Sequence, residues 1–463
     1  MKKHFFPALL LTALLAGCGT TSAVRDASGT PCDTTTDEKA PLPLLYSARD
    51  GHTANVRCLL EHGAAIDAPD DDGWNALMFA IASGQPDTAR LLLDRGSNIH
   101  ATDKKGWTPL MFAANKGRTN IARQLLDMGA AVNATERKGW TPLMFAAQDG
   151  HTDTARLLLE HGANIKTTTA EKGWDALMIA VQDGHTDVAR LLLDRGAAVN
   201  STEHKGWTPL MIAVQDGHTD TARLLLERGA KVNPVNKTGG TALMIAAGHG
   251  HTDTVRLLLD KGANIRATDE DRWTPLTFAA TKGHTDTTRL LLDRGAAVNT
   301  ADDKGWTPLM HAATDGYADT TRLLLDRGAN PNAADKRGWT PLMFAAQDGH
   351  TGIARLLLER GANISVAEER RWTALMIAAQ SGHTDTARLL LDRGSSPNAT
   401  NDGGNTALMI AAAHGHADTV RLLLDKGASI NTADKDGDTA LIFAKKKGHT
   451  AVVNMLRAAG ARE

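Results

Sequence analysis

Short apolar runs alternate with polar turns that end in glycine along most of the chain. In one stretch, apolar residues fill most of 142–148, and the chain then turns at Gly150. The next run starts at Thr152 and carries three consecutive leucines, 157–159, before it stops at Gly162. Glycine commonly ends a helix because it adopts the left-handed backbone without a steric penalty. The pattern therefore predicts a short first helix, a second helix with buried leucines, and a polar loop that leads to the next pair.

The tryptophans mark the length of this unit. All nine lie at the same place in the pattern, and neighbours are 33 residues apart except for one interval of 34 and one skipped register. They are Trp74, Trp107, Trp140, Trp174, Trp207, Trp273, Trp306, Trp339 and Trp372. The skipped register holds Gly240, and the series continues through Asn405 and Asp438, which makes twelve units. A thirteenth unit, without its loop, is in register at 43–48.

Each first helix follows a residue that caps helices well, because its side-chain oxygen accepts an N–H of the first turn. These residues are Asn75, Thr108, Thr141, Asp175, Thr208, Thr241, Thr274, Thr307, Thr340, Thr373, Thr406 and Thr439. Proline follows half of them, at the position where its missing N–H costs nothing. For the second helix, Thr152 is the predicted cap, with Asp153 near the positive end of the helix dipole.

The unit Lys-Gly-Trp-Thr-Pro-Leu-Met-Phe-Ala-Ala over 105–114 resembles the ankyrin repeat, whose signature is a Thr-Pro-Leu-His helix start and a Gly-Ala-Asp-Val-Asn loop. The usual histidine is methionine in most units, a flexible apolar filler at Met111, Met144, Met211, Met310 and Met343. The resemblance implies an all-α ankyrin-repeat solenoid of about 13 helix pairs joined by β-hairpin-like loops, over residues 42–463. Stacked units share a core and need capped ends, and lysines 445–447 form the predicted polar cap.

Residues 1–17 are predicted to be a lipoprotein signal peptide. Two lysines precede an apolar segment over 5–15 that is too short to span a bilayer. The segment ends in Leu-Ala-Gly-Cys, which resembles a bacterial lipobox and implies cleavage before Cys18 and acylation of that cysteine. The alternative is a plain secretion signal with a chance cysteine. Residues 18–41 are rich in polar and small side chains, so they are predicted to form a flexible tether.

By analogy with lipoproteins, Gly19 in place of aspartate favours the outer membrane, with the body in the periplasm. An orientation toward the cell exterior stays open. The periplasm is oxidising, so Cys32 and Cys58 are predicted to form a disulfide that pulls the tether across the open end of the stack. Such a bond could contribute on the order of 3 kcal/mol. The alternative is two free thiols, one of them buried.

Composition and charge narrow the possible functions. The formal net charge of -2 lacks the basic excess typical of nucleic-acid binding. Histidines follow the first-helix glycine once per repeat, at His151, His185, His218, His251, His284, His350, His383, His416 and His449. Packed helices lie about 8–10 Å apart and metal–histidine bonds are about 2 Å long, so neighbours cannot share one ion. Bonding between repeats is the favoured interpretation. His249 and His414 are extra and resemble no known ligand set, so no metal is expected.

No nucleophile–base pair, Gly-x-Ser-x-Gly turn or phosphate-binding loop stands out. Aspartates and histidines occur at periodic places that capping and stacking explain, without the asymmetric cluster that an active site needs. The chain is therefore expected to be neither an enzyme nor a cofactor-binding protein.

Ankyrin proteins usually bind partners with the concave side, made from loop tips and first helices, and the resemblance places the tryptophans there. The predicted partner-binding face comprises Lys105, Trp107, Lys138, Trp140, Gln148, Asp149, Trp174, Gln182, Asp183, Trp207, Gln215, Asp216, Trp273, Trp306, Trp339 and Trp372. Tryptophan is enriched in binding hot spots and can hold a neighbouring lysine or arginine by cation–π contact. Alternatively, each indole lies against the neighbouring loop and stiffens the stack. Both can hold if one ring face is packed and an edge is exposed.

Three irregularities interrupt the loops. Gly239-Gly240 carries no tryptophan, Arg272 and Arg371 replace the loop glycine, and an extra residue within 166–170 lengthens one loop. They mark places where the surface is not uniform, through the shape of a partner or through drift.

The sequence thus predicts a lipid-tethered scaffold that binds a protein partner in the periplasm. A specific version, by analogy, is an inhibitor or immunity protein that neutralises a toxin or hydrolase. The alternative is an envelope-structural protein whose tryptophans stack on the sugars of a cell-wall polymer. In both cases the only membrane contact is through the lipid.

Overall fold

A computed structural model describes residues 42–462, which form 26 α-helices arranged in consecutive pairs. The first helices of the pairs are α1 Leu42–Asp50, α3 Ala76–Ser83, α5 Pro109–Asn115, α7 Pro142–Gln148, α9 Ala176–Gln182, α11 Pro209–Gln215, α13 Ala242–Gly248, α15 Pro275–Thr281, α17 Pro308–Thr314, α19 Pro341–Gln347, α21 Ala374–Ser381, α23 Ala407–Ala413 and α25 Ala440–Lys447. The second helices are α2 Thr53–Glu61, α4 Pro86–Asp94, α6 Thr119–Asp127, α8 Thr152–Glu160, α10 Thr186–Asp194, α12 Thr219–Glu227, α14 Thr252–Asp260, α16 Thr285–Asp293, α18 Ala318–Asp326, α20 Thr351–Glu359, α22 Thr384–Asp392, α24 Ala417–Asp425 and α26 Thr450–Ala458. The predicted all-helical repeat of 13 pairs is confirmed. The predicted signal peptide and tether lie outside the described residues.

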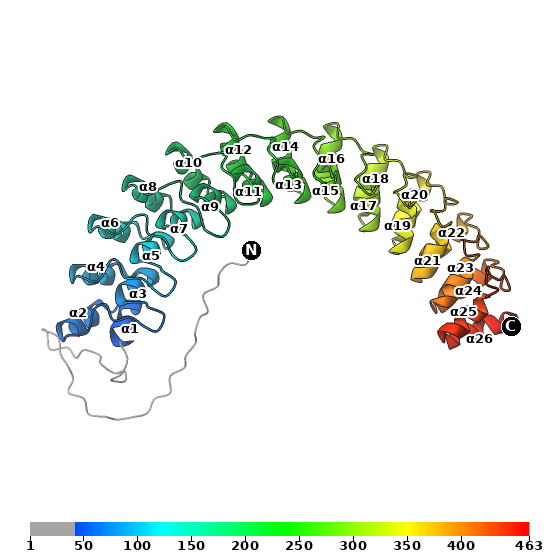
Figure 1. Cartoon of the computed structure of the whole chain (residues 1–463), viewed down its shortest axis with the longest axis horizontal. Coiled ribbons are helices and arrows are strands. Elements are labelled where there is room, and N and C mark those ends of the chain that lie inside the picture. Colours follow the sequence, from blue (N-terminus) through cyan, green and yellow to red (C-terminus); the bar gives the residue numbers. More distant parts are fainter. Residues whose placement is uncertain (1–41, 463) are drawn as a thin grey trace, which may run out of the picture. The chain divides into compact units, whose positions relative to one another are not determined.

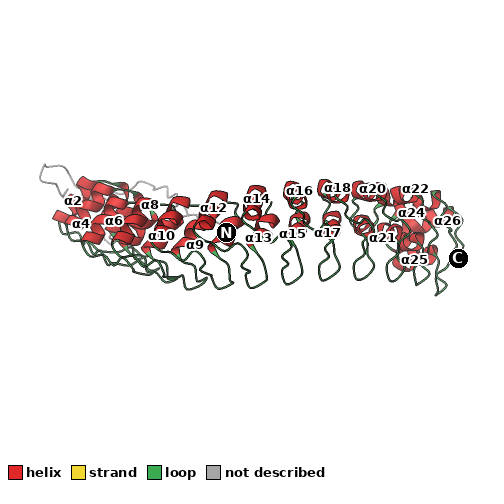
Figure 2. Cartoon of the chain, turned by 90° about the horizontal axis from the view of Figure 1, so that it is seen from above, coloured by secondary structure: helices red, strands yellow, loops and turns green. Residues whose placement is uncertain are grey.

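The chain divides into two compact units, each described by itself. Within the described residues, unit 1 contains 42–146 and 153–164, and unit 2 contains 147–152 and 165–462. In unit 2 the first helices lie side by side on the inner face of a curved stack, and the second helices form its outer layer (Figure 1). Its loops project from the helices on one side (Figure 2).

All twelve predicted caps of the first helices are confirmed. In each case the side-chain oxygen accepts the backbone N–H three residues on, as Thr208 Oγ1 does from Met211 at 3.3 Å and Asp175 Oδ1 from Met178 at 2.8 Å. In several repeats the methionine sulfur accepts the N–H of the cap in return, at 3.4 Å from Thr307 to Met310. The methionine that replaces the usual histidine therefore helps to close the helix start.

The prediction that Thr152 caps a second helix is wrong, because the helix α8 already begins at Thr152. The other second helices show what the threonine does instead. Thr186 is the first helical residue, and the cap position before it is His185, whose side chain makes no capping bond. The threonine hydroxyl turns sideways instead, because a second threonine lies within reach in the next repeat: Thr186 Oγ1 is 2.7 Å from Thr221 Oγ1. The same pairing joins Thr351 and Thr386 at 2.7 Å.

The core consists of small and aliphatic side chains from both helix layers. Leu157 and Leu158 are buried, as predicted, whereas Leu159 is only half-buried because it lies at the edge of the stripe. The core methionines are almost completely buried, with Met178 at 0% exposure. Lysines 445–447 are exposed on α25, the first helix of the last described pair, in line with a polar cap.

The loops close like hairpins but form no strands within residues 42–462. Their only regular pairings in this range are isolated bridges, Ala367 with Thr373 and Ala433 with Thr439. A typical tip closes by two main-chain bonds, Asp103 N to Trp107 O at 3.1 Å and Gly106 N to Asp103 O at 2.9 Å. None of the described helices is long and apolar enough to cross a membrane.

Candidate functional site

The loop tips are built on an acceptor that the sequence pattern did not single out. In most loops the side chain four residues before the tryptophan accepts two N–H groups of its own turn, as Asp103 Oδ1 does from Lys105 and Trp107, both at 2.8 Å. In the lengthened loop the acceptor is Thr169 Oγ1, five residues before Trp174, and it accepts the Trp174 N–H at 3.0 Å. Asp302 and Asp335 do the same. An acidic or amide residue at this place in almost every repeat was the available signal. The bonds fix the backbone that carries each tryptophan.

Neighbouring tips are also joined to one another. Lys237 N donates to Lys205 O at 3.0 Å, and Lys336 N donates to Lys304 O at 3.1 Å. Because these bonds use main-chain atoms, the side chains of the tips are left to point outward. The tips therefore form a stiff edge along each unit.

The tryptophans pack between repeats and keep part of each ring exposed. All nine are half-buried. The Trp306 ring lies 5.0 Å from that of His311 in its own repeat and 4.3 Å from that of Phe344 in the next, measured between centroids. In unit 1, Trp107 lies 4.1 Å from Phe145. The stiffening role is thus visible, and the remaining exposure is compatible with partner contact.

Cations lie over two of the rings. Lys172 Nζ is 4.7 Å from the centroid of Trp174, and Arg337 Cζ is 5.3 Å from that of Trp339. Each contact holds a positive charge against an aromatic face.

The ends of the first helices form the opposite edge of this surface. Gln148, Gln182 and Gln215 are half-buried, and their main-chain carbonyls bind the histidines of the next repeat: His185 Nε2 lies 2.9 Å from Gln148 O and His218 Nε2 3.0 Å from Gln182 O. The interpretation of these histidines as links between repeats is confirmed. The following residues, Asp149, Asp183 and Asp216, are exposed.

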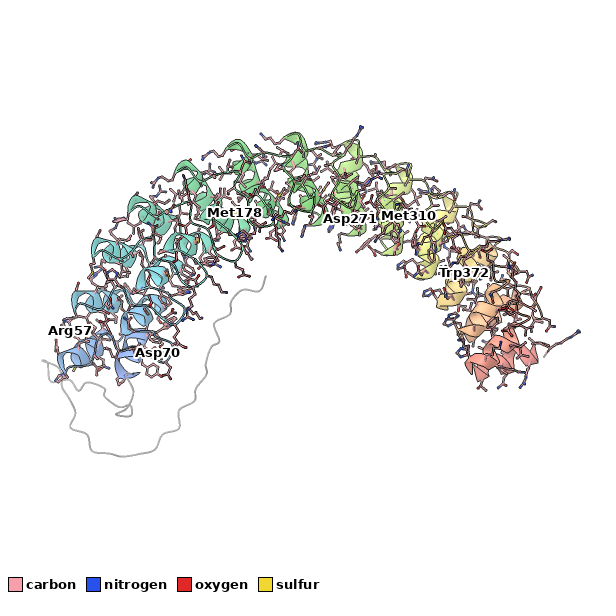
Figure 3. The ribbon with its side chains drawn as sticks, viewed as in Figure 1. Arg57, Asp70, Met178, Asp271, Met310 and Trp372 are labelled. Atoms are coloured by element: carbon pink, nitrogen blue, oxygen red, sulfur yellow. The ribbon has the colours of Figure 1, made fainter. Side chains whose placement is uncertain are left out.

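The predicted residues fall into two groups. Lys105, Trp107, Lys138 and Trp140 belong to unit 1, with both lysines exposed on the tips. The other predicted residues of the face belong to unit 2, where tips and helix ends follow one another in register; Figure 3 labels Trp372 beside the first helices of that unit.

His311 is the one strongly buried histidine on this surface. It is 8% exposed, its ring lies 4.8 Å from that of Trp273, and its Nε2 is 3.2 Å from Asp302 Oδ2. Burial lowers the pKa of His311, and the nearby Asp302 opposes that shift only in part.

No group of three or more histidine, cysteine, aspartate or glutamate side chains within residues 42–462 could hold a metal ion. His249 and His251 stack in parallel with centroids 6.0 Å apart, and His249 Nδ1 lies 2.9 Å from Ile245 O. The extra histidine therefore belongs to the bonding of its own helix.

Cys58 lies on α2, 2% exposed, and takes part in a disulfide bond. Cys18 and Cys32, the two other cysteines, lie outside the described residues, so the pairing of Cys32 with Cys58 and the lipid on Cys18 stay predictions.

A family model that describes three consecutive ankyrin repeats matches the chain. The matched residues are 10–103, 95–169, 166–236, 243–335, 329–401 and 375–462. No curated protein matches the chain.

Proposed function

The chain belongs to the ankyrin-repeat family, whose members are typically non-enzymatic scaffolds for protein–protein interaction, and from this premise we propose that it is a membrane-tethered scaffold that binds a protein partner in the bacterial periplasm. The Leu-Ala-Gly-Cys motif that ends at Cys18 and the polar segment over 18–41 support the tether. The specific form we propose is an inhibitor or immunity protein, held at the membrane where it meets its target.

The observation that carries the protein-binding role is the two-edged surface of unit 2. One edge holds the tips, with Lys205 exposed and Trp207 half-buried, and the other holds the exposed Asp183 and Asp216. A protein surface, which mixes both charges with apolar groups, can satisfy the lysines on the tips, the aspartates at the helix ends and the indoles between them. The fixed tips lose little conformational freedom on binding, which favours affinity.

The test uses the mature chain with Cys18→Ser as bait for a periplasmic extract. We expect one protein captured in stoichiometric amount, and we expect Asp183→Lys with Asp216→Lys to weaken binding by about tenfold or more, as charge reversal at an interface does. Arg190→Glu with Arg223→Glu is the matched control, because both arginines are exposed on the second helices α10 and α12. It should bind as the parent does.

If purified cell-wall material retains the chain and no protein partner is captured, the proposal is wrong and the envelope-structural alternative is favoured. Fractionation provides the test of the tether. The full chain should sediment with the membranes, and the Cys18→Ser chain should not.

A further inference from the structure

Two arginines occupy a backbone conformation that the other loops reserve for glycine. The turn residue before the tryptophan register is a glycine with φ between 72° and 89° in ten loops: Gly73, Gly106, Gly139, Gly173, Gly206, Gly239, Gly305, Gly338, Gly404 and Gly437. In the two remaining loops it is Arg272 with φ 63° and Arg371 with φ 62°. No other non-glycine residue within 42–462 has a positive φ. A side chain in this region is disfavoured because Cβ crowds the backbone.

The same position is also crowded by the next repeat. A Cβ added at Gly239 would lie 3.0 Å from Asp269 Cα, and one added at Gly305 would lie 3.0 Å from Lys336 N. Both distances are shorter than ordinary van der Waals contact. In these two glycine loops a side chain would therefore be unfavourable both because of its own backbone conformation and because of the adjacent repeat.

The arginines gain little within the chain in return. The turn bonds are the same as those of the glycine loops, since Arg371 N donates to Glu368 O at 2.8 Å. The Arg272 side chain is 64% exposed, and its Nε lies 3.8 Å from Asp303 Oδ1. Exposed pairs of this length contribute almost nothing to stability. Backbone strain that the fold does not need is typical of a functional position.

We propose that Arg272 and Arg371 are two anchors for carboxylate groups of the protein partner, on the loop tips of unit 2. This inference rests on the proposed function and adds where the partner docks and which chemistry it presents. The planar guanidinium pairs with a carboxylate through two parallel hydrogen bonds. Each arginine directly precedes a half-buried tryptophan, Trp273 or Trp372, that can pack beside the same partner group.

The surroundings favour a protein over a polyanion. Glu270 and Asp271 precede Arg272, and Asp303 lies across from it on the next tip. Figure 3 labels Asp271 beside the first helices of unit 2. These carboxylates repel an extended chain of negative charges but admit a single carboxylate aimed at the arginine.

The spacing limits the size of the contact. The two arginines are three repeats apart, and at about 8–10 Å per packed helix the separation is roughly 24–30 Å. An α-helix spans that length with about 16–20 residues. The partner therefore needs acidic groups at both ends of a helix-sized surface.

The probe is a displayed library of 20-residue helical peptides, selected on the full mature chain that carries Cys18→Ser. We expect enrichment of aspartate and glutamate near both peptide ends, and binding about tenfold weaker or more to the Arg272→Gly and Arg371→Gly double variant. Arg289→Gln with Arg388→Gln is the matched control: it removes the same two charges from the second helices α16 and α22, where both arginines are exposed, and should bind as the parent does.

A second readout separates binding from folding. Because glycine relieves the strain, the double variant should unfold at a temperature roughly 2–4 °C higher, while Gly338→Arg, which introduces the strain, should lower it. A loss of stability in the double variant would show that the arginines serve the fold, and would overturn the inference.

Other outcomes also overturn it: no selected peptides, peptides without carboxylate enrichment, equal binding by the double variant, or arginine-dependent retention of an anionic wall polymer. If the periplasmic partner binds the double variant unchanged, this inference fails and the proposed function stands. If peptides are selected as expected but no protein partner exists, the proposed function fails.

Discussion

A histidine at position 311 stands where the neighbouring repeats carry Phe278 and Phe344. Its ring lies between the indoles of Trp273 and Trp306, at centroid distances of 4.8 Å and 5.0 Å. Desolvation by this packing lowers the pKa of His311 below its ordinary value of 6.5, against the opposing effect of Asp302 and Asp315; Lys304 lowers it further. The folded state therefore prefers the neutral ring, and protonation opposes folding.

The sign of the pH effect follows from this shift. As the pH falls, His311 takes up its proton near pH 6.5 in the unfolded chain but only at a lower pH in the folded chain. The free energy of unfolding therefore decreases as the pH falls from the pKa of the unfolded chain to that of the folded chain. His311→Phe removes this dependence and keeps a ring that the adjacent repeats accommodate. We expect the variant to gain stability relative to the parent between about pH 7.5 and pH 5, in urea unfolding followed at each pH.

The parent and the His311→Phe variant share all other histidines, so the titration of those histidines cancels when the two free energies of unfolding are subtracted. Burial also lowers the pKa of His284, which makes the comparison with the parent at every pH essential. A stability difference that is constant across this pH range would contradict the argued role of His311.

At the scale of the elements, links between repeats complement the caps within them. In six closing loops an asparagine bonds twice to the next repeat. Asn332 Nδ2 donates to Gly361 O at 2.9 Å, and Asn332 Oδ1 accepts from Asn363 N at 2.7 Å. The caps could be predicted because donor and acceptor are three residues apart. The asparagine links could not, since their partners lie about one repeat away and the pairing depends on how the helices stack.

Asn332→Ala removes both bonds. We expect it to lower the free energy of unfolding by about 1 kcal/mol, a modest figure because the site is exposed to water. Amide hydrogen exchange at Asn363 should accelerate as its acceptor is lost. Asn332→Asp keeps that acceptor and should restore protection of the Asn363 amide, while the bond to Gly361 stays lost. Unchanged exchange in Asn332→Ala would show that the link does not hold the repeats together.

At the scale of the whole molecule, the repeat pattern foretold the fold more fully than the binding surface. Periodic glycines and apolar runs determine helix pairs locally, so the number of pairs and the caps of the first helices followed from the sequence. The tryptophans were assigned to the right loops, but the packing of Trp107 against Phe145 and of Trp273 against His311 depends on the adjacent repeat. The strain at Arg272 was likewise invisible, because it arises from a backbone angle.

The terminal repeats of a stack unfold most easily, because one of their faces lacks a neighbouring repeat. The first described pair, α1 and α2, carries Cys58 with its Sγ 3.9 Å from His62 Nδ1. The predicted Cys32–Cys58 bond would fasten the upstream segment to this end of unit 1. Cross-linking stabilises mainly by restricting the unfolded chain.

Cys32→Ser and Cys58→Ser should each lower the stability of unit 1 by on the order of 3 kcal/mol under oxidising conditions. The double variant should lose no more than either single one, because both remove the same bond. A reductant should lower the free energy of unfolding of the parent to that of the variants. Because reduction leaves both cysteine side chains in place, it separates the loss of the bond from a change in side-chain packing. Peptide mapping of the unreduced protein should recover a fragment that joins Cys32 to Cys58. Two free thiols in the denatured, unreduced chain, or a bond from Cys58 to Cys18, would refute this pairing and leave the end of the stack to its polar surface alone.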